Sequence, residues 1–255
     1  MSRKSFVLGI GIAVVLASAV SGVLVLLVRS EPSAYSRVAA PAGEARETCS
    51  KEFVSGLTDL MNYIQWEDAA SAKEWEVVFT EQQINSFLDE DFVHSGMNEK
   101  LLPECISEPR VAIERDRLRV MFRYGSGAWS TVISIDLNVW LAGKEPNVVA
   151  LELKSFRAGS LPISAQSLLE RISDGLRRNS VEVSWYRYNG NPVAVLHFQS
   201  DPPNSFVQLK NLTLEEGQIT LHGSSADDAG ALLLVPFSPR RAWERSMPGR
   251  ALALR

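Results

Sequence analysis

The chain has 255 residues, 45% of them apolar, which is enough for one large or two small domains with a packed core. Its formal charge of -4 is uneven: residues 1–47 carry +2, residues 48–228 carry -10 and residues 229–255 carry +4. A central region this acidic argues against nucleic acid as a partner, because phosphate contacts need clustered Lys and Arg.

Residues 5–28 contain no charged side chain and follow Arg3 and Lys4. Because about 20 apolar residues suffice to cross a bilayer, residues 1–28 predict a short cytoplasmic end and a transmembrane helix. The leading positive charges favour a cytoplasmic N-terminus, so the rest of this single-pass protein is expected in the periplasm or at the cell surface. The alternative is a cleaved secretory signal, with Ala17-Ser18-Ala19 as the cleavage pattern.

Residues 29–47 mix Pro, Ala, Gly, Ser and charged residues without periodicity, which predicts a flexible stalk. The main domain is expected over residues 48–228. It opens with an amphipathic helix behind Ser50, a residue type that often caps helices. Its apolar residues recur at helical spacing. They are Phe53, Leu57, Leu60, Met61 and Ile64.

A second helix is predicted from Glu81 to about Glu90 by a strong local pattern. Thr80 and Gln83 have the spacing of a capping box, and Phe79 and Ile84 that of a hydrophobic staple.

The same pattern recurs at Ile163-Ser164 and opens a third amphipathic helix. Its apolar side consists of Leu168, Leu169, Ile172 and Leu176.

Alternating apolar and polar residues predict antiparallel strands joined by tight turns. One hairpin covers Val111 to Phe122, and a long strand from Ala128 to Leu141 follows it. Further pairs flank Asn189-Gly190 and Glu215-Glu216-Gly217. The long strand places one apolar row on a single face, which another part of the molecule or a ligand must cover. The row includes Trp129, Ile133, Ile135, Leu137 and Val139.

The end of the chain differs in composition. Residues 231–237 are apolar but too short to span a membrane, and residues 239–255 hold five arginines without periodicity. We expect an edge strand followed by a disordered tail over 229–255. The alternative is a contact between this tail and anionic lipids.

The chain has two cysteines, Cys49 and Cys105. Outside the cytoplasm an even pair is most simply a disulfide, which would tie the first helix to the loop before the first hairpin. Two free thiols or a metal site remain the alternative, but no His lies at ligand spacing.

The sequence contains no recognisable catalytic set. His94, His197 and His222 lie far apart and belong to no metal or hydrolase motif. The acidic run Asp89-Glu90-Asp91 lacks the spacing of a calcium loop and is typical of a solvated helix end. We therefore expect neither an enzyme nor a bound metal or cofactor.

Arg117, Arg119 and Arg123 fall on one face of the second hairpin strand. Such a row of guanidinium groups could bind the phosphate or carboxylate of a lipid headgroup. The simpler interpretation is cross-strand pairing with Glu114 and its neighbours.

The chain resembles the YpmS-like family of single-span, extracytoplasmic bacterial proteins. The similar segments are Val78–Asn85, the hairpin from Val111 to Phe122, the long strand after it, and Ala158–Pro162 before the third helix. The resemblance covers about residues 77–223. It implies an α+β fold: an elongated, twisted antiparallel sheet with two to three amphipathic helices packed on one face, in outline like tubular lipid-binding domains. The family has no known catalytic residues.

Two functions follow. The first is a membrane-anchored module, held by residues 5–28, that binds or hands on an apolar ligand such as a lipid in a groove between sheet and helices. The groove would be lined by Trp129, Ile133, Ile135, Leu137, Val139, Leu168 and Ile172. The second is a non-catalytic scaffold of a cell-envelope complex, with the same face packed dry and the acidic surface meeting a protein partner.

Overall fold

The computed structural model describes residues 16, 18–65, 73–127, 130–142, 147–164, 182–197, 207–225 and 252–253. The strands are β1 (Lys73–Thr80), β2 (Ile106–Glu114), β3 (Arg117–Tyr124), β4 (Thr131–Leu141), β5 (Val148–Ala158), β6 (Leu161–Pro162), β7 (Glu182–Tyr188), β8 (Asn191–His197), β9 (Val207–Glu215), β10 (Gln218–Ser225) and β11 (Leu252–Ala253). The helices with assigned bounds are α2 (Ser33–Arg37), α3 (Glu44–Gln65), α4 (Glu81–Asp89), α5 (Asp91–His94) and α6 (Met97–Leu101).

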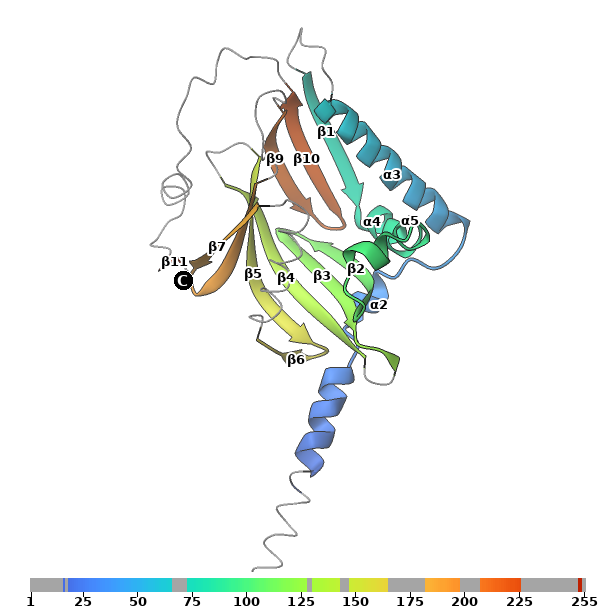
Figure 1. Ribbon diagram of the computed structural model, residues 1–255, viewed down its shortest axis with the longest axis vertical. Coiled ribbons are helices and arrows are strands. Elements are labelled where there is room, and N and C mark those ends of the chain that lie inside the picture. Colours follow the sequence, from blue (N-terminus) through green and yellow to red (C-terminus); the bar gives the residue numbers. More distant parts are fainter. Residues whose placement is uncertain are drawn as a thin grey trace, which may run out of the picture.

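The strands form two antiparallel sheets (Figure 1). The smaller has three strands in the order β1-β10-β9. The larger has eight, in the order β11-β7-β8-β5-β4-β3-β2, with β6 paired to β5. Neighbours in sequence are mostly neighbours in space, as short hairpin connections require.

The predicted hairpins are confirmed. Val111 in β2 pairs with Val120 in β3, and Asp116 in the turn between them has a φ of 59°. Asn189 and Gly190 both have positive φ in the turn between β7 and β8, a conformation that these two residue types tolerate best. The long strand is confirmed as β4, which lies between β3 and β5.

The predicted capping box at the start of α4 is also confirmed. Thr80 Oγ1 accepts from the Gln83 backbone N–H at 3.2 Å, and the Thr80 N–H donates to Gln83 Oε1 at 2.9 Å. α3 begins at Glu44 rather than behind Ser50, and it runs alongside β1 (Figure 1). Phe53 of α3 packs on Phe79 with 4.9 Å between ring centroids, so α3 covers one face of the smaller sheet.

The described part of the chain contains no helix long and apolar enough to cross a membrane. This contradicts the predicted transmembrane helix over residues 5–28 and the single-pass location derived from it. Residue 16 and residues 18–29 are described as helical. Residues 5–15 and residue 17 lie outside the described ranges.

The predicted single sheet with helices packed on one face is wrong as well. The strands form two sheets, and α4 contacts α3, β1 and the edge strand β2. Its side chains explain this position, because the Ile113 N–H donates to Glu81 Oε2 at 2.7 Å and the Val111 N–H donates to Asn85 Oδ1 at 2.8 Å. These polar bonds hold α4 at the edge of the larger sheet. The third predicted helix, behind Ser164, lies outside the described residues.

Part of residues 29–47, expected as a flexible stalk, packs against the sheet instead. Tyr35 in α2 is completely buried and Val38 nearly so, in a cluster with Ala112, Met121 and Val132. Of the predicted disordered tail over 229–255, residues 252–253 are described, and they pair with β7.

Candidate functional site

The apolar row of β4 is buried at one end and half-exposed at the other. Ile133 and Ile135 are 6% and 7% exposed and pack together with Phe122 and Phe156. From Leu137 onward the row is only half-buried. The exposure of the β4 side chains on this face therefore increases along the strand, while Leu153 and Val149, their partners on β5, stay buried.

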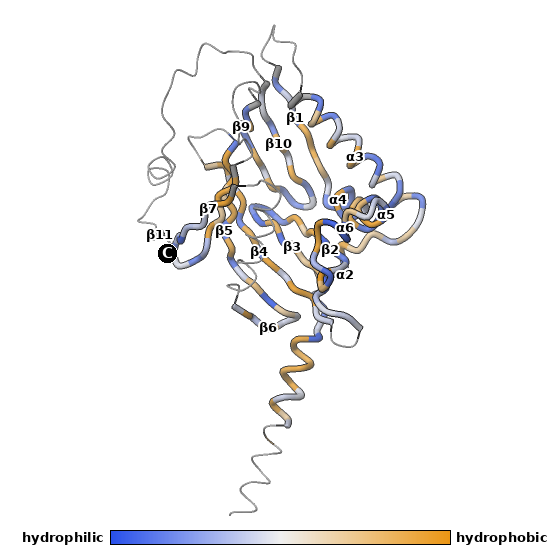
Figure 2. Tube along the Cα trace, viewed as in Figure 1, coloured by the Kyte–Doolittle hydropathy of each residue, from blue (hydrophilic) through white to orange (hydrophobic). Residues whose placement is uncertain are grey.

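The half-buried part of the row continues across neighbouring strands. The pairing of β4 with β5, β5 with β8 and β8 with β7 places apolar side chains of all four strands on one face. Hydrophobic residues recur along these strands in Figure 2. We call the half-buried set the apolar face. It consists of Leu137, Val139, Leu141, Leu151, Val183, Trp185 and Leu196.

The structure thus brings together four of the predicted groove residues: Ile133 and Ile135 in the packed cluster, Leu137 at its margin and Val139 on the apolar face. Trp129, Leu168 and Ile172 lie outside the described residues. The sequence identified β4 from its alternation, but it missed the contributions of β7 and β8 because these depend on strand order.

The row of arginines is neutralised by carboxylates. Arg119 Nε donates to Asp136 Oδ1 at 2.5 Å, and its Nη1 lies 3.3 Å from Glu114. Arg117 lies 3.6 Å from Glu114, and Arg123 lies 3.3 Å from Glu108. The simpler interpretation, cross-strand pairing, therefore describes these contacts, and the three arginines are engaged within the chain.

Asp136 is the centre of this network because it also accepts from Ser155 Oγ at 2.7 Å. Burial acts to raise the pKa of Asp136, but the hydrogen bonds from Arg119 and Ser155 and the charges of Arg119 and Arg117 outweigh it, so the pKa is lowered. Asp136 thus remains ionised in the folded protein and holds β3, β4 and β5 together.

The opposite face of the larger sheet is aromatic and contains a buried carboxylate. Trp140 is half-buried and packs with Tyr186 and Tyr188 against buried valines of β5 and β8. Glu152 is 2% exposed, and its Oε1 accepts from Lys154 Nζ at 2.8 Å and from Asn191 Nδ2 at 2.9 Å. These bonds satisfy the carboxylate and indicate a structural role.

Tyr35 fastens α2 to the sheet. Its hydroxyl donates to the Glu108 backbone oxygen at 2.9 Å, and the Arg110 guanidinium lies 4.3 Å from the centre of its ring. Burial raises the pKa of Tyr35 to about 12, so the hydroxyl keeps its proton and remains a donor.

The two cysteines are free, which contradicts the predicted disulfide. Each belongs to a different local structure. Cys49 lies in α3, next to Ser50, whose hydroxyl donates a hydrogen bond to Asp91 at 2.5 Å. Cys105 lies where β2 and β3 meet, and its backbone oxygen accepts a hydrogen bond from the Gly125 N–H at 2.8 Å. A disulfide needs Cα atoms within about 7 Å and suitably directed Cβ atoms, and sequence parity says nothing about either.

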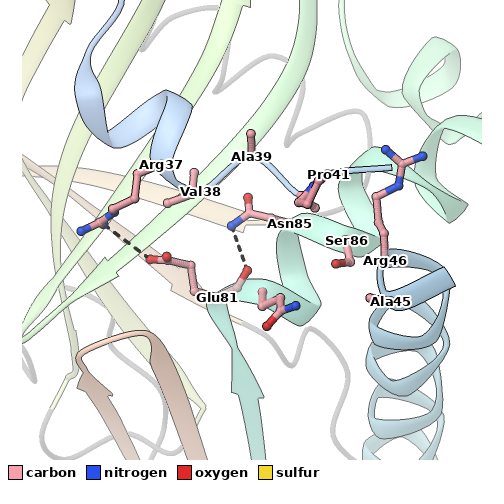
Figure 3. A pocket seen from close by; sticks show the side chains of 11 residues that line it. Arg37, Val38, Ala39, Pro41, Ala45, Arg46, Glu81, Asn85 and Ser86 are labelled. Carbon is pink, nitrogen blue, oxygen red and sulfur yellow. Dashed lines mark hydrogen bonds and ion pairs between the residues drawn. The ribbon is translucent and has the colours of Figure 1, made fainter. Parts of the chain in front are cut away.

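A pocket that sequence reasoning missed lies between the segment after α2, the start of α3 and the middle of α4 (Figure 3). Its volume is about 260 Å³. Its polar walls come from Arg37, Arg46, Glu81 and Ser86. These residues come from three separate parts of the chain, so no spacing in the sequence could have marked them.

Asp89 lies near this pocket, at the end of α4, and accepts a hydrogen bond from the Ala40 backbone. Burial raises the pKa of Asp89, and this effect is only partly offset by Arg110, by the Ala40 hydrogen bond and by Arg46. The contact ties the wall formed by the segment after α2 to α4.

Among the described residues, no group of three or more His, Cys, Asp or Glu side chains could hold a metal ion. The chain matches no family model, no curated protein and no solved structure. The resemblance to the YpmS-like family therefore stays a prediction.

Proposed function

We propose that the chain binds an apolar molecule, in particular the acyl chain of a lipid, on the apolar face. The observation that carries this proposal is the change in burial along β4, from packed Ile133 and Ile135 to half-buried Val139 and Leu141. An acyl chain lying there would remove these side chains from water at no cost in unpaired polar groups.

The dimensions of the apolar face support such a ligand. Leu137 and Leu141 are four residues apart along β4, roughly 13 Å, and the strands β4 to β7 extend over roughly 14 Å. Each methylene group buried there would contribute about 0.8 kcal/mol. Because Arg117, Arg119 and Arg123 are engaged with carboxylates, binding would depend on the apolar part of the lipid rather than on its headgroup.

The test is native mass spectrometry of the full chain, combined with solvent extraction and identification of any co-purified lipid. Val139→Asn introduces an amide into the apolar face, and we expect about tenfold weaker retention of acyl lipid, since a buried valine contributes ~1.5 kcal/mol. Val78→Asn is the matched control, because Val78 is 44% exposed on β1 of the other sheet.

Absence of any acyl lipid from the full chain would contradict the proposal, as would equal lipid retention by the two variants. Either result would favour the second candidate, a non-catalytic scaffold whose apolar face is packed dry and whose acidic surface meets a protein partner. The packed cluster around Ile133 and Ile135 and the neutralised arginines are the observations that favour this alternative.

A further inference from the structure

The pocket between the segment after α2, α3 and α4 combines charged and apolar walls. Val38, Ala45 and the residues 39–41 form the apolar part, and Arg37 and Arg46 lie on opposite sides of the pocket (Figure 3). Ligand pockets usually measure ~300–1,000 Å³. A volume of about 260 Å³ therefore suits a small metabolite with a short apolar body.

Arg37 is only loosely held in the folded chain. Its Nη2 lies 3.9 Å from Glu81 Oε2, and its side chain is 54% exposed. Glu81 Oε2 already accepts the Ile113 N–H at 2.7 Å, so the stronger interaction of this carboxylate is with β2. The Arg37 guanidinium can therefore turn toward a ligand without breaking a strong ion pair.

Two buried polar atoms at the pocket wall have no hydrogen-bond partner among the described residues: Ser86 Oγ and Arg46 Nε. Ser86 is completely buried, and it lines the pocket beside Asn85 (Figure 3). Asn85, by contrast, makes three hydrogen bonds, to Glu81 and Val111. Nearly all buried polar groups in native proteins are paired, and an acceptor on a bound ligand would supply the partner that these two donors lack within the described residues.

The balance of charge defines that ligand. Arg46 is bound to Glu90 at 2.5 Å and is therefore neutralised within the chain, whereas Arg37 lies 3.9 Å from Glu81, whose Oε2 already accepts the Ile113 N–H. Among the described lining residues, Arg37 is thus the loosely held positive charge, and a single guanidinium matches one carboxylate better than a doubly charged phosphate. We propose that the pocket binds a small organic monocarboxylate, with Arg37 as its ion-pair partner and Ser86 and Arg46 as hydrogen-bond donors.

The experiment is a ligand-observed NMR titration of the full chain with hexanoate, hexanamide and inorganic phosphate. Hexanamide has the shape of hexanoate without its charge, so we expect hexanoate to bind about tenfold more tightly than hexanamide. Phosphate should bind more weakly than hexanoate. Equal binding of hexanoate and hexanamide, tighter binding of phosphate, or no saturable binding of hexanoate would overturn the proposal.

Variants locate the site. Arg37→Gln and Ser86→Ala should each weaken hexanoate binding at least about threefold while leaving the melting temperature unchanged or higher, because neither residue makes a strong internal bond. Ser134→Ala is the matched control: Ser134 Oγ is also buried without a partner among the described residues, but it lies in β4, outside the pocket. Equal effects of the two serine variants on binding would place the ligand elsewhere and refute the assignment.

Discussion

Asp136 shows how a single charged residue stabilises the centre of the larger sheet. It lies in β4 and accepts hydrogen bonds from Arg119 of β3 and Ser155 of β5. Its side chain is 14% exposed, so solvent screens these bonds only in part. We expect the network to contribute measurably to folding.

The first prediction concerns Asp136→Asn. At neutral pH this change should lower the free energy of unfolding by about 1–2 kcal/mol, because a charge-assisted pair becomes a weaker neutral one. Since the pKa of Asp136 is lowered in the folded state, its contribution is complete above the unfolded pKa of ~3.9 and is lost as pH falls through the folded value. Urea unfolding of both proteins between pH 7 and pH 2.5 measures this.

The control is Glu74→Gln, which removes a carboxylate that is 68% exposed and paired with Lys210. This change should have almost no effect on the unfolding midpoint. A difference between Asp136→Asn and the wild type that stayed constant down to pH 2.5 would show that the network does not act through the charge of Asp136.

At the scale of elements, Gly159 decides how the helix over residues 18–29 meets the larger sheet. This helix projects from the end of the molecule (Figure 1). Gly159 has a φ of +58°, and a Cβ atom there would clash with the backbone oxygens of Leu27 and Val28. The neighbouring Ser160 N–H donates to the Leu27 oxygen at 2.9 Å. Glycine is thus required both by the backbone conformation and by the close approach of the helix end.

The second prediction is that Gly159→Ala separates the helix end from the sheet. Gly190→Ala is the matched control, because Gly190 also has a positive φ, of +85°, but has no atom within 4 Å of a built Cβ. Both changes should cost about 1 kcal/mol for the left-handed conformation. Only Gly159→Ala should also increase the hydrogen-exchange rate of the Ser160 amide, and equal exchange in the two variants would contradict this view.

For the whole molecule, a set of hydrogen bonds joins α4 to both sheets. The Glu81 N–H donates to the Gly217 oxygen at 2.7 Å, and the Gly217 N–H donates to the Ile113 oxygen at 2.9 Å. Asn85 adds the bonds to Val111. The smaller sheet, the helix and the edge of the larger sheet are therefore expected to unfold together.

The third prediction tests this junction with Asn85→Ala. The change leaves the Val111 N–H and C=O without their partner, so we expect a loss of about 2–4 kcal/mol in the free energy of unfolding, within a single transition. Asn211→Ala, an exposed change in β9, should cost less than ~0.5 kcal/mol. Two separate transitions in calorimetry of the wild type would show instead that the sheets unfold independently.

The features that could be predicted from the sequence are those that depend on residues close together in the chain. Thr80 and Gln83 are three residues apart, and the β2–β3 turn contains Asp116, so both features could be identified locally. The position of α4 could not be predicted in this way. It depends on the hydrogen bond between Asn85 and Val111, which are 26 residues apart, whereas the apolar pattern of the helix suggested that it would cover the face of the sheet.

The same limit explains the errors near the N-terminus and in the candidate sites. The composition of residues 29–47 is that of a linker, but Tyr35 finds a partner 73 residues away in Glu108 and becomes buried. Cys49 and Cys105 were paired by number alone, whereas both are free in the structure. The Arg row was correctly located on one face, and its carboxylate partners on β2 and β4 follow from strand order.

The bonds between α4 and β2 have a consequence for self-association. Among the described strands, β2 is the last of the larger sheet, and such an edge can be extended by a strand from a second copy of the chain. Glu81, Asn85 and Gly217 already occupy the Val111 N–H and C=O and the Ile113 N–H and C=O. The helix therefore blocks edge-to-edge pairing with another chain along this part of β2.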